Sequence, residues 1–335
     1  MLTIKPDKPE DVPTYPEANF AVTREATEEL DLAGPLNIPE KAIVVLRVKT
    51  GRFTLNISVN TLRRSDRLVV TFMGARGGSA KDNANARRPM FARRDWDVLF
   101  DAPILAISDP QTEIDWDSSV ARAGFYLGTF KDDLVPEIHA LINKVCDEIG
   151  VSRDRVVMYG ASSGATSAML VGGRRREGTG IIAACPFLRP DNYRTQVIEI
   201  GSRAAGGTLA DWERMSEEAP WRNNPLTALR DGLVAGNNVR AVIAQNLKDK
   251  STINRHFPGL WRRFDINPEG GISPDGHVMA ALYNAPAAGH GHEPPKLSRP
   301  LVTMAYEFFD RPLGSAQKDR KSGRPKATAD ESADA

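Results

Sequence analysis

The segment Gly160-Ala161-Ser162-Ser163-Gly164 places two adjacent serines between glycines, directly after an apolar run. Small residues on both sides of Ser162 match the pattern G-x-S-x-G, in which the serine occupies a strained turn between a strand and a helix. Such a turn lifts the hydroxyl above the sheet, at the N-terminus of a helix whose dipole favours developing negative charge. The pattern predicts that Ser162 is a nucleophile, with a plain strand-to-helix turn as the alternative. Ser163 is the lesser candidate, and its backbone N–H is expected to be one oxyanion donor.

A serine nucleophile needs a base and an acid, and the chain offers both farther along. His290 and His292 lie in the glycine-rich stretch APAAGHGHEPP (285–295), which follows the last apolar run. We favour His292 as the base because two prolines follow it closely and restrict the loop, and we keep His290 as the alternative. The base would take the hydroxyl proton of the serine.

Asp249 is the first carboxylate after the apolar run VRAVIAQN (239–246) and is the expected acid. Its role would be to orient the imidazole and stabilise the imidazolium. The rivals are Asp265 and Asp275, which lie farther from the end of that run. For each of the three, a turn or capping carboxylate is the alternative interpretation.

The remaining histidines have simpler explanations. His139 lies within an amphipathic helical pattern, and His256 follows the acid loop. His277 begins the last predicted strand, at the end opposite to the expected site. We therefore expect structural roles for all three.

The second oxyanion donor is expected in the loop Gly74-Ala75-Arg76-Gly77-Gly78, which follows a buried strand. Glycines let a backbone N–H turn inward at little steric cost, and we assign the donor to the Ala75 backbone. Arg76 is a candidate contact for an anionic substrate group. A flexible glycine-rich turn is the alternative, whereas a phosphate-binding P-loop is excluded because no Gly-Lys-Ser/Thr follows.

These residues are joined by elements that alternate between strand and helix patterns. Near-continuous apolar runs predict buried strands, and apolar residues at helical spacing predict amphipathic helices. The predicted strands are 41–50, 53–60, 67–74, 102–110, 154–160, 178–187, 238–246 and 277–284. The predicted helices are 132–150, 164–176 and 296–309, with a helical, irregular region at about 190–236.

The order Ser162, Asp249, His292 along these elements resembles the α/β-hydrolase superfamily, over about residues 65–310. The resemblance implies an α/β fold with a mostly parallel central sheet and helices on both faces. It also implies a Ser-His-Asp triad and a lid-like insert at about 190–236, where Trp212 and Trp221 could shape a pocket.

The expected domain organisation has three parts. Residues 1–40 form an N-terminal arm with little regular structure, and residues 41–313 form the hydrolase domain, which begins with a β-hairpin extension. The tail 314–335 lacks aromatic and large aliphatic residues and is expected to be disordered.

The expected function is cleavage of an ester bond by a serine hydrolase through an acyl-enzyme. The strings ISDP (107–110) and FYLG (125–128) resemble, more narrowly, bacterial hydrolase-fold proteins linked to surface-polysaccharide synthesis and accessory secretion. This resemblance implies a small ester or an acylated glycan as substrate. An acyltransferase with the same triad, or a non-catalytic interaction module, is the alternative.

Composition excludes several other classes of protein. The 335 residues are 41% hydrophobic and 26% charged with a formal net charge of +1, which argues against a nucleic-acid partner. No run approaches the length of a membrane-spanning helix, and the polar N-terminus lacks a signal sequence, so a cytoplasmic protein is expected. Cys146 and Cys185 are expected to be reduced core thiols, and no spacing indicates a metal or an organic cofactor. The sequence leaves the oligomeric state open.

Overall fold

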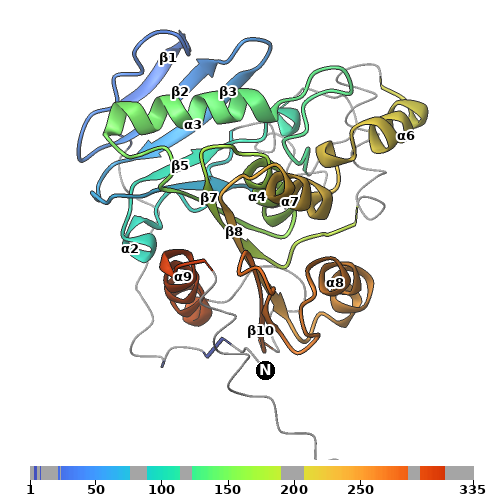
Figure 1. The fold of residues 1–335 in the computed structure, drawn as a ribbon. Helices are drawn as coiled ribbons and strands as arrows, with labels where there is room; N and C mark the ends of the chain where they lie inside the picture. The colour runs from blue at the N-terminus through green and yellow to red at the C-terminus, as the bar shows by residue number, and fades with distance from the viewer. Residues whose placement is uncertain are drawn as a thin grey trace, which may run out of the picture.

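The computed structural model describes residues 4–5, 8, 22, 24–75, 89–113, 123–189, 207–285 and 295–313. In these ranges, ten strands form one sheet in the order β1-β2-β3-β5-β4-β6-β7-β8-β10-β9 (Figure 1). The strands are β1 (Arg24–Asp31), β2 (Ile43–Lys49), β3 (Thr54–Asn60), β4 (Leu68–Phe72), β5 (Ile104–Ile107), β6 (Val156–Ala161), β7 (Thr179–Ala184), β8 (Val239–Asn246), β9 (Gly271–Ile272) and β10 (Val278–Tyr283).

Six neighbouring strands of this sheet run parallel. They are β5, β4, β6, β7, β8 and β10, so their carboxyl ends all meet at one edge. The strand β3 is antiparallel to β5 and to β2, and it therefore ends at the opposite edge. The register pairs Phe72 with Gly160 and Asn246 with Tyr283, which aligns the strand ends that carry the predicted site.

Helices cover both faces of the sheet (Figure 1). One face packs against α3 (Val135–Ile149), α4 (Ser163–Gly173), α7 (Pro225–Val234) and α8 (Lys250–Phe264). The other face packs against α2 (Asp97–Phe100) and α9 (Pro295–Asp310). The remaining helical segments are η3 (Pro110–Thr112), α6 (Leu209–Glu218) and η5 (Pro220–Arg222).

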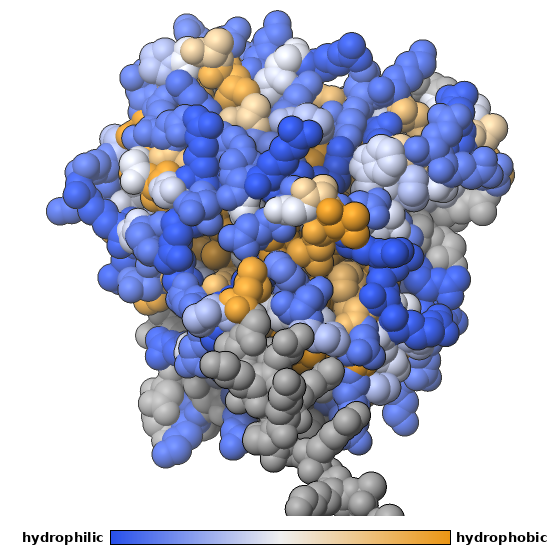
Figure 2. All heavy atoms as spheres, viewed as in Figure 1, coloured by the Kyte–Doolittle hydropathy of each residue, from blue (hydrophilic) through white to orange (hydrophobic). Residues whose placement is uncertain are grey.

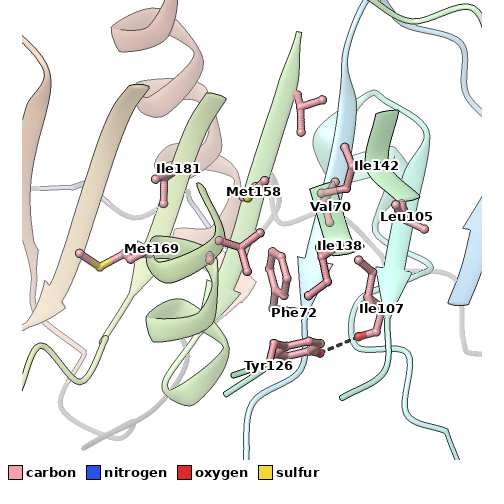
Figure 3. Packing of buried hydrophobic residues seen from close by; sticks show 14 of the residues in the cluster. Val70, Phe72, Leu105, Ile107, Tyr126, Ile138, Ile142, Met158, Met169 and Ile181 are labelled. Atoms are coloured by element: carbon pink, nitrogen blue, oxygen red, sulfur yellow. Dashed lines mark hydrogen bonds between the residues drawn. The ribbon is translucent and has the colours of Figure 1, made fainter. Parts of the chain in front are cut away.

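Alternation of side chains along the central strands builds the two cores. Val156 and Met158 of β6 point to the α3 and α4 face, whereas Val157 and Tyr159 point to the α9 face. Figure 3 shows the first of these cores, in which Val70, Phe72 and Met158 meet side chains of α3 and α4. Because both faces are covered, β4, β6, β8 and β10 are buried along their whole length, as the apolar runs predict.

One sequence expectation needs correction. Residues 24–31 were expected to have little regular structure, but they form the edge strand β1 beside β2. The predicted hairpin of β2 and β3 forms, and it extends the parallel part of the sheet because β3 pairs with β5. The predicted loop after β8 spans residues 247–249, and the helix α8 begins directly after Asp249. The tail 314–335 lies outside the described residues.

The surface is mixed in character. Figure 2 shows mainly hydrophilic residues on the face in view, with hydrophobic residues in smaller groups between them. Both cysteines are buried thiols outside any disulfide, as expected for reduced core thiols. Across the described ranges, no helix combines the length and the apolar character that crossing a membrane requires.

Candidate active site

Ser162 sits in a sharp turn between β6 and α4. Its backbone has φ 55° and ψ −124°, a conformation that L-residues rarely adopt and that stores strain. Its N–H donates to Ala184 O on the neighbouring strand β7, and its carbonyl accepts from Ala165 and Thr166 in the first turn of α4. From 156 to 173, all of them described residues, Ser162 is the only one that is not buried. The strand and helix together hold one partly exposed serine at the carboxyl edge of the sheet.

The two glycines of the motif are required by close backbone packing. A Cβ on Gly160 would overlap the backbone of Gly164 and Ala165. A Cβ on Gly164 would lie 2.5 Å from Phe72 O and 2.8 Å from Met73 O. The absent side chains therefore allow the first turn of α4 to rest on β6 and on the end of β4.

The loop that follows β4 lies beside this turn. A Cβ on Gly74 would contact Ala161 O at 3.3 Å, so the backbone of this loop passes next to the residue that precedes Ser162. Ala75 follows and is exposed. Both predicted oxyanion donors, the N–H groups of Ser163 and Ala75, thus belong to neighbouring segments at the same edge. Arg76 lies outside the described residues.

Asp249 lies at the same edge, after β8, and is 6% exposed. Its Oδ1 caps α8, accepting from Thr252 N at 3.1 Å and from Ser251 Oγ at 3.0 Å. The capping role that the sequence left open is therefore real, and it fixes the carboxylate in place. A helix N-terminus also stabilises its negative charge.

The rival carboxylates lie elsewhere. Asp265 is exposed at the far end of α8, which places it about 24 Å from Asp249 at about 1.5 Å per residue. Asp275 lies in the turn before β10, at the opposite edge of the sheet, where its Oδ1 accepts from Ser273 Oγ and His277 N. Of the three, only Asp249 lies at the edge that carries Ser162.

Asn246, the last residue of β8, joins the acid loop to the histidine loop. Its amide exchanges two hydrogen bonds with the Ala285 backbone, and its Oδ1 also accepts from Lys248 N at 3.1 Å. Ala285 is the residue from which the histidine loop departs. His290 and His292 themselves lie outside the described residues. Sequence reasoning missed Asn246, whose only signal was a polar residue at the end of an apolar run.

Tyr283 and Cys185 form a buried contact below this edge. The Tyr283 hydroxyl and the Cys185 Sγ are 3.0 Å apart, and Cys185 has a left-handed backbone with φ 51°. Burial, the Cys185 thiol and the Asp249 carboxyl together raise the pKa of Tyr283. The Tyr283 hydroxyl is therefore neutral, and the negative charge of Asp249 is one of the causes of its raised pKa.

The three other histidines make structural contacts. His139 Nε2 bonds to Val171 O at 2.8 Å, and burial lowers the pKa of His139 to about 4. His277 Nδ1 bonds to Val239 O at the amino edge of the sheet. His256 is buried on α8, and its Nδ1 accepts from Leu188 N at 2.9 Å.

The described part of the predicted insert, residues 207–236, is mostly helical, and its helix α7 packs against α4. Trp212 is buried in a small cluster with Phe125 and Leu127, whereas Trp221 is 39% exposed. Arg222 donates to the carbonyls of Leu127, Thr129 and Phe130. These contacts fasten the insert to the segment 123–134.

Comparison with solved structures places the chain in a known fold. Two structures of the capsule O-acetyltransferase of Neisseria meningitidis serogroup A match at TM-scores of 0.53 and 0.51, with 12% and 13% identity. Each covers 82% of this chain, and the matches cover 98% and 95% of the acetyltransferase chains. A fluorophosphonate-binding serine hydrolase from Staphylococcus aureus matches at a TM-score of 0.48 with 8% identity, covering 81% of this chain and 99% of that one.

No protein-family model and no curated protein matches the chain. At these identities the similarity to solved structures establishes the fold alone. The chain has the α/β-hydrolase fold, as the order of its sequence motifs predicts.

Proposed function

We propose that this chain is a serine hydrolase that cleaves an ester bond through an acyl-enzyme. The observation that carries the proposal is the strained backbone of Ser162, a partly exposed residue within an otherwise buried strand and helix. Strain of this kind persists only where the surroundings enforce it, and it is concentrated at functional sites. Here the packing at Gly160 and Gly164 enforces it.

The proposed reaction begins with His292, oriented by Asp249, accepting the proton of the Ser162 hydroxyl. The serine oxygen attacks the ester carbonyl carbon, and the resulting oxyanion accepts hydrogen bonds from the N–H groups of Ser163 and Ala75. The imidazolium then protonates the leaving alcohol. Water, deprotonated by the same imidazole, attacks the acyl-enzyme and releases the carboxylic acid.

The arrangement of strands supports the pairing of acid and nucleophile. Adjacent strands are about 4.8 Å apart, so the ends of β6 and β8 are separated by about 10 Å. This gap accommodates one imidazole with a hydrogen bond on each side. The loop that would supply the imidazole begins at Ala285, which Asn246 holds beside the acid loop.

Hydrolysis of p-nitrophenyl acetate by purified variants tests the proposal. Ser162→Ala is expected to lower kcat by about 10⁴-fold or more, and Ser163→Ala, which retains the backbone donor, to leave it within a few-fold. Asp249→Asn is informative because asparagine caps helices as well as aspartate does. A loss of about 10⁴-fold in Asp249→Asn, with Asp275→Asn unchanged, supports the acid role. Full activity in Asp249→Asn would show that Asp249 only caps α8 and is not the catalytic acid.

The acyl acceptor and the substrate class are separate questions. The matched O-acetyltransferase is named for acyl transfer, and the same three side chains can pass an acyl group to a sugar hydroxyl instead of water. We propose water as the acceptor and a small ester or an acylated glycan as the substrate. Mass spectrometry of a deacetylated glycan incubated with p-nitrophenyl acetate and the protein separates the two outcomes, since acyl transfer adds acetyl groups to the glycan.

A further inference from the structure

A buried carboxyl group organises the loop beside the proposed oxyanion hole. Asp109 follows β5 and is 1% exposed. Its Oδ1 accepts from Gln111 N at 3.2 Å, and its Oδ2 accepts from Gly124 N at 2.7 Å and Tyr126 N at 3.4 Å. A Cβ on Gly124 would lie 2.8 Å from Asp109 Oδ1, so the backbone passes directly against the carboxyl group. Asp109 thereby holds a segment that is distant from it in sequence.

The segment held by Asp109 is strained. Phe125 and Tyr126 have φ values of 57° and 56°, so two consecutive aromatic residues adopt the left-handed conformation. Bulky residues avoid this conformation, and a consecutive pair needs strong local support. The hydrogen bonds from the N–H groups of Gly124 and Tyr126 to Asp109 stabilise this backbone conformation. Burial of both aromatic side chains stabilises it further.

The strained backbone directs the Tyr126 side chain to the ends of two strands. Its hydroxyl donates to Ile107 O, at the end of β5, at 2.6 Å (Figure 3). The same oxygen accepts from Met73 N, the first residue after β4, at 3.0 Å. The ring packs edge-on against Phe72 with centroids 5.0 Å apart. Tyr126 therefore fixes the point at which the chain leaves β4.

Met73 is held from a second direction as well. The N–H of Asp109 points at Met73 Sδ at 3.4 Å. The next residues are Gly74, which lies against Ala161 O, and Ala75, the proposed second oxyanion donor. A shift of Met73 would move the Ala75 N–H relative to Ser162.

We propose that Tyr126 is a positioning residue for the oxyanion hole, acting through Met73 on the Ala75 N–H, with Asp109 holding Tyr126 in place. The proposal rests on the proposed function of Ser162. Because the Ala75 N–H bonds to the oxyanion more strongly than to the neutral ester, its displacement lowers kcat and leaves KM nearly unchanged.

The test compares Tyr126→Phe with Tyr306→Phe. Tyr306 also donates its hydroxyl to a backbone carbonyl, that of Phe100, but its ring lies against Arg67 at the opposite edge of the sheet. We expect Tyr126→Phe to lower kcat for p-nitrophenyl acetate about tenfold or more, with KM within twofold. Inhibition by phenylboronic acid, whose serine adduct carries an oxygen in the oxyanion hole, should weaken by a similar factor. Tyr306→Phe should change neither quantity.

Equal kcat values in the two phenylalanine variants, with Ser162→Ala inactive, would overturn the role of Tyr126 and leave the proposed function intact. Unchanged hydrolysis in Ser162→Ala would overturn both proposals. Should Tyr126→Phe fail to fold, Asp109→Asn serves as the second variant, because it places an N–H₂ group opposite a backbone N–H and releases the same segment. A kcat in Asp109→Asn equal to that of the unmodified protein would then contradict the proposal.

Discussion

Asn246 and Ala285 exchange a pair of hydrogen bonds across the ends of β8 and β10. Asn246 Nδ2 donates to Ala285 O at 3.0 Å, and Asn246 Oδ1 accepts from Ala285 N at 3.1 Å. The side-chain amide thus continues the parallel ladder beyond the last paired residues, Asn246 and Tyr283. The contact ties the segment that leads to Asp249 to the segment that leads to His290 and His292.

Removal of the hydrogen bonds between Asn246 and Ala285 should impair catalysis more than folding. Asn246→Ala leaves the Ala285 and Lys248 groups without their side-chain partner and is expected to lower the free energy of unfolding by about 1–3 kcal/mol. It should also lower kcat, by up to about 10²-fold, because small misplacements of catalytic groups are costly. The measurements are urea unfolding and ester hydrolysis.

The matched control is Asn60→Ala. Asn60 is buried, bonds to Arg94 O and Leu62 N, and ends a strand at the opposite edge. It should lose comparable stability while keeping kcat. Equal kcat in the two variants would refute the positioning role of Asn246.

The glycines at the serine turn provide a test of packing. Gly160→Ala and Gly164→Ala each place a methyl group into backbone atoms, and each should destabilise the protein by about 3 kcal/mol or more. Gly150→Ala is the comparison, because Gly150 has φ 72° but no neighbouring atoms within 4 Å. It should cost only about 1–2 kcal/mol of backbone strain. Losses of only about 1–2 kcal/mol at Gly160 and Gly164, measured by denaturant unfolding, would show that the backbone accommodates the added methyl group and would contradict the close-packing requirement.

The difference between local and long-range signals explains what the sequence could predict. The Ser162 turn and the buried strands were predictable because glycine spacing and apolar runs are local patterns. The edge strand β1 was missed because its described side chains are largely exposed and give no apolar run. The contact between Tyr126 and Met73 joins residues 53 positions apart, and no sequence pattern in either segment predicts it. His290 and His292 remain predictions, as does the choice between them.

Asp109 should give the protein a distinct dependence of stability on pH. Burial raises the pKa of Asp109 to about 6, against the lowering effect of its three backbone bonds and with a further increase from Glu113. In the unfolded chain the pKa is about 3.9. Between these values the native state binds the extra proton, so the stabilising contribution is present below about pH 4 and is lost as the pH rises through 6.

The variant Asp109→Asn lacks this titrating group, so comparison with the unmodified protein isolates the contribution of Asp109. The free energy of unfolding of the unmodified protein, minus that of Asp109→Asn, should fall by on the order of 3 kcal/mol from pH 4 to pH 7. Urea titrations of both proteins at several pH values measure this difference. A constant difference over that range would mean that the carboxyl group titrates at its ordinary pKa.

The central claim is that Ser162 is an activated nucleophile, and a fluorophosphonate probe tests it most directly. Trypsin releases the peptide 156–174, which contains Ser162 and Ser163, and fragment-ion masses assign the modified residue. The account predicts one phosphonyl group on Ser162, formed rapidly in the unmodified protein and in Ser163→Ala and absent in Ser162→Ala. Folded protein that stays unlabelled, or that carries the label on another residue, would contradict it.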